Sequence, residues 1–338
     1  MMNLRILKKE IDLAEWSIKV FNSNLIYSKK PDDKIFNDPS IKAEDVTDVP
    51  AEFVADPFLT FYKSRFYLFF EVLNMRSELG EIGLATSEDG EKWTYQKIVL
   101  KERYHLSYPH VFEFEDQFYM VPESSEAKEV ILYKAKNFPY EWEKYSVIAN
   151  GKYIDPTIFQ YNSKWWMFVG TPNGDLHLFY SEKIEGKWIK HSLSPIIKDN
   201  YNISRPAGRV IIDNNKIYRF TQDCKPYYGK QVRSFIINKL TENEYQEEEI
   251  NIILNGSDKN NDWRRDGMHH IDQLKINGNE WLIAVDGHKF KTHNYLKWKI
   301  KSIYRAPVAN INRLLNNLNL LREPYLNFGI LMLHQLTY

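Results

Sequence analysis

Short runs of alternating hydrophobic and polar residues, each followed by a polar turn, recur along the chain. The first pair of runs covers residues 55–61 and 66–71, with the turn Lys63-Ser64-Arg65 between them. Alternation with a period of two and enrichment in aromatic residues are typical of β-strands joined as a hairpin. The same strand–turn–strand pattern returns in four later copies, at residues 108–123, 154–170, 208–220 and 269–286.

The copies follow one another at intervals of about 50 residues, which is close to the length of one propeller blade. Further strand-like runs lie between the copies, at residues 83–93, 130–133, 176–180 and 232–237. Each unit therefore supplies about four strands, and the repeat predicts an all-β, five-bladed β-propeller. A two-sheet β-sandwich is the alternative, but a sandwich does not predict five matched copies.

The last unit lacks an evident outer pair of strands. The early segment Glu15–Phe21 reads as a strand, and we expect it to pair with the last unit and to close the ring. The predicted domains are therefore a propeller over residues 1–290 and a tail over residues 291–338.

The tail differs from the propeller in its charge. From Gly287 to Arg322 there is no Asp or Glu, while basic residues recur together with Trp298 and Tyr304. Apolar residues after Pro307 have helical spacing, so a basic amphipathic helix is expected. Such a helix can make a peripheral contact with an anionic membrane, or it can pack on the propeller or on a second subunit.

Composition and charge exclude several classes of protein. The 338 residues carry 45 Lys+Arg and 45 Asp+Glu, and this balance gives no case for a nucleic-acid partner. No apolar run has the roughly 20 residues that a membrane helix needs, and the first residues lack the apolar stretch of a secretory signal. Cys224 is the single cysteine, so no internal disulfide forms and a cytoplasmic location is expected. Aromatic residues make up 15% of the chain, which favours β-structure and is often seen in sugar-binding proteins.

The repeat also predicts where the ionisable side chains gather. The first strand of a blade lines the central axis and the second runs back, so the start of the first and the end of the second lie on one face. The residues at these positions are Asp56, Tyr108, His110, Asp155, Arg205, Arg209, His269 and His270 at the starts, and Glu71, Glu123, Gln222, Asp223 and Asp286 at the ends. Buried charges are costly, so this gathering indicates a functional site. The alternative for the Asp-Pro pairs is a role in starting turns.

Several of these stretches resemble known carbohydrate-active proteins. Ala55-Asp56-Pro57 and Ile154-Asp155-Pro156 resemble the Asp-Pro pairs of family-43 glycoside hydrolases, which are five-bladed propellers. A closer similarity is to the amino-terminal domain of plant glucosamine inositolphosphorylceramide transferases, and it covers roughly residues 50–288. The stretches that carry it are Ala55–Leu59, Leu68–Glu71, His105–Pro109, Met120–Glu123, Thr221–Cys224 and Tyr228-Gly229. The resemblance implies a sugar-handling propeller; in the plant enzymes a separate carboxy-terminal domain looks like the glycosyltransferase.

The resemblance to the hydrolases implies roles for individual residues. Asp56 would be the general base and Asp155 the residue that tunes and orients. The fourth blade departs from the pattern, because Ser204-Arg205-Pro206-Ala207-Gly208 has no carboxylate where the general acid should be. Hydrolysis of a glycoside needs such an acid, so Glu123 or Glu71 would have to replace it.

Glycosyl transfer from a nucleotide sugar fits this substitution better. The diphosphate leaving group needs charge stabilisation more than protonation, and Arg205 and Arg209 with the nearby histidines are expected to supply it. Asp56 or Asp155 would deprotonate the acceptor hydroxyl. The two arginines could instead hold an acidic sugar or form structural salt bridges.

The preferred function is therefore glycosyl transfer in the assembly of a cell-surface polysaccharide or glycolipid, with a lipid-linked glycan as acceptor. The alternatives are a glycoside hydrolase and a non-catalytic glycan-binding module. No cofactor is expected, because no dinucleotide or P-loop motif occurs and the histidines lack metal-ligand spacing. A central divalent ion, structural or catalytic, stays open.

Overall fold

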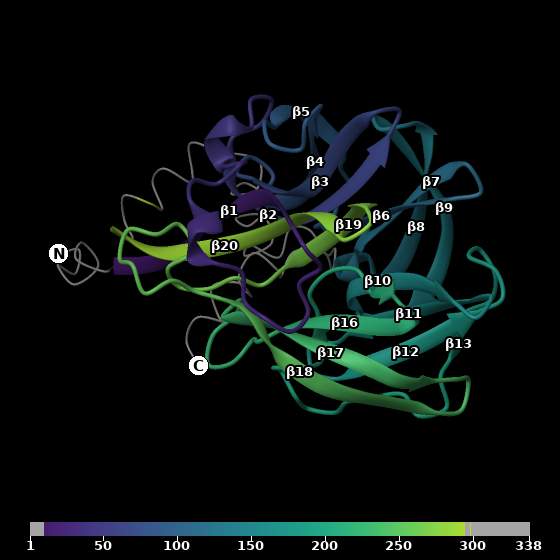
Figure 1. Cartoon of the computed structure of the whole chain (residues 1–338). Helices are drawn as coiled ribbons and strands as arrows, with labels where there is room; N and C mark the ends of the chain where they lie inside the picture. The colour runs from purple at the N-terminus through teal and green to yellow at the C-terminus, as the bar shows by residue number, and fades with distance from the viewer. Residues whose placement is uncertain (1–9, 295–297, 299–338) are drawn as a thin grey trace, which may run out of the picture.

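The computed structural model describes residues 10–294 and residue 298 (Figure 1). Its strands form five antiparallel sheets, which follow one another around a common centre as the blades of a propeller. The predicted five-bladed, all-β architecture is thereby confirmed, and the alternative of a two-sheet sandwich is wrong.

The first three blades are four-stranded sheets in which each strand pairs with the next along the chain. Blade 1 consists of β2 (Ala51–Tyr62), β3 (Arg65–Asn74), β4 (Leu79–Ser87) and β5 (Thr94–Leu100). Blade 2 consists of β6 (Ser107–Phe114), β7 (Gln117–Glu123), β8 (Glu129–Asn137) and β9 (Glu141–Asn150). Blade 3 consists of β10 (Ile154–Tyr161), β11 (Lys164–Gly170), β12 (Leu176–Ser181) and β13 (Ile189–Lys190).

Blade 4 differs because its inner strand is interrupted. The two short pieces β14 (Arg205–Pro206) and β15 (Ile211–Asp213) both pair with β16 (Lys216–Gln222), and β17 (Gln231–Leu240) and β18 (Tyr245–Asn255) complete the sheet. Gly208 lies in the gap between them with φ 130°. The gap brings backbone of blade 4 close to the centre, as described below.

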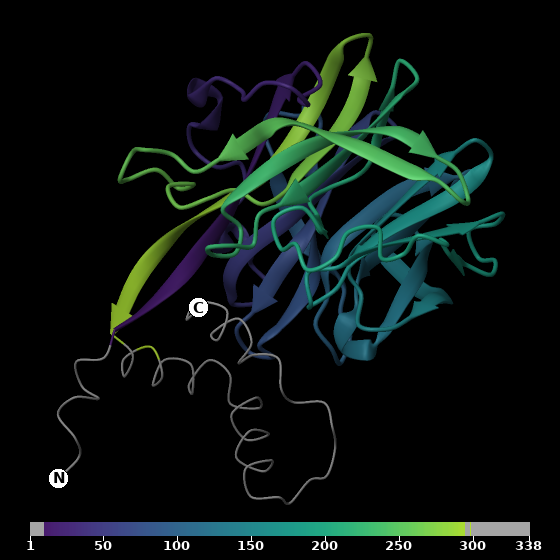
Figure 2. The ribbon, with the colours of Figure 1, turned by 90° about the horizontal axis from the view of Figure 1, so that it is seen from below.

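Blade 5 joins the two ends of the described chain. It contains β19 (Ile271–Asn277), β20 (Glu280–Asn294) and, as its outer strand, β1 (Glu10–Ser23). β1 and β20 pair antiparallel from Glu10 opposite Asn294 to Ser23 opposite Trp281. Figure 2 shows the two strands extending together beyond the other blades. The segment Glu15–Phe21 thus supplies the outer strand of the last blade and closes the ring.

Three short 3-10 helices connect these strands. They are η1 (Asp33–Phe36) and η2 (Ala43–Asp45) between β1 and β2, and η3 (Ser125–Ala127) between β7 and β8. Residues 291–294, which the sequence analysis placed in a helical tail, belong to β20. The rest of the predicted basic helix lies outside the described residues, apart from Trp298. Among the helices that are described, none combines the length and the apolar character needed to cross a bilayer.

The hydrophobic core consists of one cluster between each pair of neighbouring blades. Alternation along β3 shows how the clusters arise: Phe69 packs toward blade 2, while Leu68 and Phe70 pack toward blade 5. Three further clusters fill the interfaces between blades 2 and 3, 3 and 4, and 4 and 5. Because both faces of a blade are buried, its strands are apolar on both sides near the centre.

Gly208 provides a test of how tightly the centre is packed. A Cβ atom at this position would lie 1.7 Å from the carbonyl oxygen of Ile271 in blade 5, and φ is 130°. We expect Gly208→Ala to lower the free energy of unfolding by about 3 kcal/mol or more, since overpacking and backbone strain act together. Denaturant unfolding measures the change.

Gly278 is the matched control. It has φ 42° and no atom within 4 Å of an added Cβ. Asn tolerates this left-handed conformation, so Gly278→Asn should change the free energy of unfolding by less than about 0.5 kcal/mol. Equal stability of Gly208→Ala and Gly278→Asn would contradict the described packing.

Candidate active site at the centre of the propeller

Three blades begin with the same local distortion. Asp56, Tyr108 and Asp155 each precede a proline and have φ of 52°, 47° and 50°. Each sits where the register between the first and second strands of its blade shifts. A bulge of this kind turns a side chain out of the regular pleat, and left-handed φ at a residue other than glycine is strained. The repeat therefore directs one polar side chain from each of blades 1, 2 and 3 to the same place.

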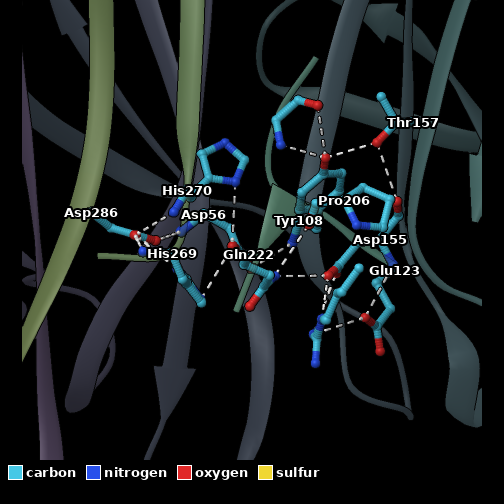
Figure 3. A network of polar contacts seen from close by, with 12 residues as sticks. Asp56, Tyr108, Glu123, Asp155, Thr157, Pro206, Gln222, His269, His270 and Asp286 are labelled. Atoms are coloured by element: carbon cyan, nitrogen blue, oxygen red, sulfur yellow. Dashed lines mark hydrogen bonds and ion pairs between the residues drawn. The ribbon is translucent and has the colours of Figure 1, made fainter. Parts of the chain in front are cut away.

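Asp155 is held by blade 4. Arg205 donates from Nε to Asp155 Oδ2 at 2.5 Å, and its Nη2 lies 3.7 Å from Glu123 Oε2. Gln222 donates from Nε2 to the same Asp155 oxygen at 3.2 Å. Glu123 Oε2 also accepts a hydrogen bond from the backbone N–H of Asp155 at 3.4 Å. The predicted residues Asp155, Glu123 and Arg205 thus form one contact network. Figure 3 labels Asp155 and Glu123 on one side of the view.

Asp56 is held by blade 5. Its backbone N–H donates to Asp286 Oδ2 at 2.9 Å. Asp286 Oδ1 accepts from His269 Nδ1 at 2.7 Å and from the backbone N–H of His270 at 3.0 Å. Asp56 Oδ1 lies 3.7 Å from His269 Nε2 and 3.5 Å from His270 Nδ1. Figure 3 shows these four side chains together on the other side of the same network.

Tyr108 connects the two halves. Its backbone N–H donates to Asp56 Oδ2 at 3.3 Å. Its hydroxyl lies 2.7 Å from Thr157 Oγ1 in blade 3 and accepts from the Gly208 N–H of blade 4 at 2.7 Å. One fully buried side chain from blade 2 therefore touches blades 1, 3 and 4, and we call the whole group the central cluster: Asp56, Tyr108, Glu123, Asp155, Arg205, Gln222, His269, His270 and Asp286.

The central cluster contains four carboxyl groups, one guanidinium group and two imidazole rings. Burial raises the pKa of Asp56 well above its usual value, and the neighbouring charges of Asp155, Glu71 and Asp286 raise it further. Burial also raises the pKa of Asp155, to about 7, although the Arg205 charge opposes this shift. Asp286 behaves differently: burial alone would raise its pKa, but His269, His270 and the backbone N–H of Asp56 lower it below the usual value. The pKa values of Asp56 and Asp155 are thus raised, whereas the pKa of Asp286 is lowered.

Glu71 extends the acidic region next to Asp56. It is buried, and its Oε1 lies 3.1 Å from Nε2 of His105. Nδ1 of His105 accepts a hydrogen bond from the Gly80 N–H at 2.9 Å, which leaves Nε2 as the protonated nitrogen that faces Glu71. Glu71 is therefore a neighbour of the central cluster with an imidazole partner of its own.

Aromatic side chains cover the cluster. The Tyr228 ring lies 4.8 Å from the Arg205 guanidinium and meets the His269 ring edge-on at 5.1 Å. The Trp16 ring stacks on His269 at 4.1 Å. Only 19% of the Arg205 side chain and 11% of the Glu123 side chain are exposed, against 5% for Asp56. A ligand from solvent therefore meets Arg205 and Glu123 first.

Trp16 also lines a cavity of about 490 Å³, whose lining includes none of the residues of the central cluster. The cavity lies between β1, the segment 36–44 and the loop 259–263. Its lining includes Trp263 together with both acidic and basic side chains, namely Glu15, Asp38, Lys42, Glu44, Glu52, Lys259, Asp262 and Lys289. A polar cavity with aromatic walls has the character of a carbohydrate-binding space.

Two residues that the sequence placed in the site lie elsewhere along the axis. Arg209 forms an ion pair with Asp272 and donates from Nη2 to the carbonyl oxygen of Leu59 at 2.7 Å. His110 accepts a hydrogen bond from the Ile158 N–H at 3.2 Å, and its ring stacks on Phe58. Both interact electrostatically with His270, and their polar groups tie inner strands of different blades together. Arg209 and Arg205 have different carboxylate partners, Asp272 and Asp155, and a joint role for the two arginines at one ligand stays a prediction.

Asp223 is also used within the protein. Arg233 donates to it from Nε at 2.7 Å and from Nη2 at 2.9 Å, and Gln231 donates at 2.6 Å. These bonds join the end of β16 to β17 within blade 4. A bidentate arginine leaves Asp223 few acceptor sites for a ligand.

Sequence reasoning placed Tyr108 and Gln222 at the predicted rim but gave neither a role in the site. Tyr108-Pro109 occupies the position of Asp56-Pro57 and Asp155-Pro156 in the repeat, and this alignment was a usable signal. Gln222 aligns with Glu71 and Glu123, since all three pair with the start of an inner strand. Trp16 and Tyr228 gave no such signal, because they reach the centre from an outer strand and from a loop.

Asp56, His269 and Asp286 offer ligand atoms that lie within 4.8 Å of one another, a spacing that would suit a metal ion. The hydrogen bonds at this point argue for another explanation. Asp286 Oδ1 accepts from two backbone N–H groups and from His269 Nδ1, and its Oδ2 accepts from the Asp56 N–H. These donors satisfy the carboxylate within the protein, and we assign no metal ion to the three residues.

Comparison with known sequences gives relatives that share most of the chain. It is 37% identical over 248 residues to glucosamine inositolphosphorylceramide transferase 1 of Oryza sativa subsp. japonica, covering 70% of this chain and 33% of the relative. It is 34% identical over 302 residues to the protein of that name from Arabidopsis thaliana, covering 82% of this chain and 40% of the relative. The chain therefore spans between a third and two fifths of the length of these relatives.

Solved structures share the fold at low sequence identity. An arabinanase from Bacillus subtilis matches with a TM-score of 0.51 and 16% identity, over 69% of this chain and 93% of that structure. A point mutant of Cellvibrio cellulosa α-L-arabinanase matches with the same TM-score and identity, over 70% of this chain and 90% of that structure. At this identity the likeness concerns the propeller fold alone.

One family covers nearly the whole propeller. Residues 15–288 match the family described as glucosamine inositolphosphorylceramide transferase 1, N-terminal. The matched range begins in β1 and ends in β20, so it contains all five blades and every residue of the central cluster. The chain belongs to the family of the N-terminal domain of glucosamine inositolphosphorylceramide transferase 1.

Proposed function

We propose that this chain takes part in glycosyl transfer during the assembly of a cell-surface glycolipid or polysaccharide, and that the central cluster handles the sugar. Membership of a family named after a glycosyltransferase supports the reaction class. The buried network of ionisable groups supports the place, because such groups are costly in a purely structural centre.

The observation that carries the proposal is the charge of the cluster. The cluster holds four carboxyl groups, those of Asp56, Glu123, Asp155 and Asp286, and one guanidinium, that of Arg205, which pairs with Asp155 and Glu123. Glu71, with His105 as its partner, lies beside Asp56. Such a site favours a sugar that carries a positive charge over one that carries a negative charge. The relatives are named for glucosamine, whose amino group carries that charge when protonated. An amino sugar is therefore the substrate class that we propose.

The individual roles follow from exposure and protonation. Asp56 takes the proton of the acceptor hydroxyl, and Asp155 and Glu123 orient the sugar. Arg205 is the one guanidinium of the described cluster and stabilises the negative charge that develops on the leaving group. Protonation of Asp155 removes one of its two carboxylate partners, which makes the Arg205 charge available to a nucleotide diphosphate.

The acceptor in this proposal is a lipid-linked glycan. The cavity beside Trp16 is the space that we assign to its sugar, since it has polar and aromatic walls and Trp16 also contacts His269 of the cluster. The reaction would then take place at a membrane surface.

One observation favours hydrolysis as a second candidate. The raised pKa values of Asp56 and Asp155 suit a general acid, which the family-43 pattern places in blade 4. Blade 4 has Arg205 at the corresponding strand start, paired with Asp155. Hydrolysis would therefore need the acid to come from blade 1 or 3.

Donor-dependent transfer tests the proposed function. Purified protein is incubated with nucleotide-linked amino sugars and a lipid-extract acceptor, and the product is followed by mass spectrometry. We expect transfer to fall at least about 100-fold in Asp56→Asn, because general-base catalysis typically contributes this much or more. Asp213→Asn is the control, since Asp213 lies at the end of β15 and pairs with Lys275.

The same preparations separate the other candidates. Release of free sugar from aryl glycosides, lost in Asp56→Asn, would establish a hydrolase instead. Sugar binding without turnover of either substrate would establish a binding module. Absence of transfer, together with absence of a thermal shift with every nucleotide sugar, would refute glycosyl transfer by this chain.

The pKa of Asp155 predicts how binding of an amino sugar depends on pH. Asp155 has a pKa of about 7, so it is mostly neutral at pH 6 and mostly ionised at pH 8. Binding of glucosamine relative to N-acetylglucosamine should therefore strengthen as pH rises from 5.5 to 7.5. Titration calorimetry over this range measures the ratio of the two dissociation constants.

The Glu123→Gln variant tests whether Asp155 is the group that causes this pH dependence of binding. The Glu123 charge raises the pKa of Asp155, so its removal should move the pH midpoint of the binding ratio downward. Glu113→Gln is the matched control, because Glu113 is exposed on the same blade. A binding ratio that does not change with pH in the wild type would contradict recognition of the amino group by Asp155.

A further inference from the structure

His269 lies between two buried carboxyl groups, one of which is firmly ionised. Asp286 is fully buried and accepts the 2.7 Å hydrogen bond from His269 Nδ1. A carboxylate is an acceptor only, so Nδ1 carries the proton of the neutral ring. The other nitrogen, Nε2, is left with a free lone pair, and it lies 3.7 Å from Asp56 Oδ1.

The proton of Asp56 faces this lone pair. Asp56 Oδ2 accepts the Tyr108 N–H at 3.3 Å, so a proton on the carboxyl group is expected on Oδ1. His270 Nδ1 is the other nitrogen near Oδ1, at 3.5 Å. Burial lowers the pKa of His270 to about 3, so its ring is a poor site for an additional proton. His269 is therefore the better acceptor of the two.

Three neighbours would stabilise a protonated His269 ring. Asp286 supplies a negative charge at Nδ1. The Trp16 ring lies 4.1 Å from the His269 ring at an interplanar angle of 32°, within the distance at which a cation is attracted to an aromatic ring. The Tyr228 ring approaches at 5.1 Å.

We propose that His269 is the proton partner of Asp56, and that Asp286, His269 and Asp56 form a proton relay at the centre of the propeller. In the first step the Asp56 O–H bond breaks and an Nε2–H bond forms, which gives a carboxylate and an imidazolium paired with Asp286. In the second step the Asp56 carboxylate takes the proton of the substrate hydroxyl as its oxygen attacks the sugar. His269 acts through Asp56 and is a positioning residue for that proton. The second step depends on the proposed function, whereas the first does not.

The relay explains how Asp56 can act as a base despite its raised pKa. In a site with several carboxyl groups, ionisation of one more is unfavourable unless a positive charge appears beside it. The imidazolium of His269 supplies this charge at the oxygen that ionises. The groups that face Asp56 from the surrounding blades are Glu71, Tyr108, Asp155, Arg205, Tyr228, His270 and Asp286, in addition to His269.

The test measures the proton on Asp56 directly. The carbonyl stretch of the protonated carboxyl group is isolated as the infrared difference between the wild type and Asp56→Asn, and its loss is followed as the pH rises. His269→Gln keeps a polar side chain but removes the proton acceptor. We expect it to move the midpoint upward by about one pH unit, a tenfold change in acidity.

His288→Gln is the matched control. His288 is fully buried and lies 4.1 Å from Trp16, as His269 does, but it has no described contact with Asp56. We expect its midpoint to equal that of the wild type. A midpoint in His269→Gln equal to that in His288→Gln would overturn the relay, because both variants lose one buried imidazole on Trp16.

Nitrogen NMR of the wild type gives a second test that does not depend on the folding of a variant. At neutral pH, His269 should show a protonated Nδ1 and an unprotonated Nε2, and the reverse tautomer would overturn the proposal. Neither measurement uses a sugar. A shifted midpoint in a protein without transferase activity would keep the relay and discard the transfer reaction, while active transfer with an unshifted midpoint would do the opposite.

Discussion

Burial of several carboxyl groups around one guanidinium is the constraint on which the centre of this protein depends. Asp155 and Glu123 share Arg205, and Asp286 uses backbone N–H groups and His269 in place of a second arginine. Asp56 has neither a guanidinium of its own nor a set of backbone donors like that of Asp286. Burial and the neighbouring carboxylates therefore raise its pKa well above the usual value, and Asp56 and Asp155 are the two carboxyl groups of the cluster whose pKa is raised.

The pairing of β1 with β20 both closes the ring and completes the surroundings of the central cluster. β1 pairs with β20 along its whole length, and the same pairing places Trp16 opposite His288 and Ile18 opposite Asp286. Blade 5 thereby receives both its outer strand and the aromatic ring that covers His269. Because Asp286 lies on β20 and accepts from the Asp56 N–H, the electrostatics of Asp56 depend on a strand more than 200 residues away in sequence, and β1 completes the blade that holds this strand.

The sequence predicts the architecture well because each copy of the repeat consists of short strand and turn patterns that can be recognised locally. Alternation in β3 and turns such as Lys63-Ser64-Arg65 each need only a few residues, and five copies add their evidence. Blade 4 is the exception in detail, since its inner strand breaks around Gly208 to receive the Tyr108 hydroxyl. That interruption depends on a contact across the axis, which no local pattern reports.

The site is less predictable because an end-of-strand position does not determine a side chain's partner. Asp56 lies in the first strand of blade 1 and Asp223 follows the second strand of blade 4, where Arg233 pairs with it within the same blade. Arg205 and Arg209 are close in sequence, but they pair with carboxylates of different blades, Asp155 of blade 3 and Asp272 of blade 5. The repeat could therefore nominate the acidic residues at the centre, whereas the partners of the two arginines required the contacts themselves.

Arg205 at the start of the inner strand of blade 4 changes what the propeller can do. A general acid at this place would protonate a leaving oxygen and then need to recover its proton from water. A guanidinium holds its protons throughout and can only stabilise negative charge, which suits a leaving group that is already an anion. Under the proposed transfer reaction, the proton of the nucleophile would be carried by another blade. Asp56, whose pKa is raised and whose Oδ1 lies 3.7 Å from His269 Nε2, is the carboxyl group that we propose for this role. On that proposal, the arginine in blade 4 and the imidazole–carboxyl pair between blades 5 and 1 are two parts of one chemical arrangement.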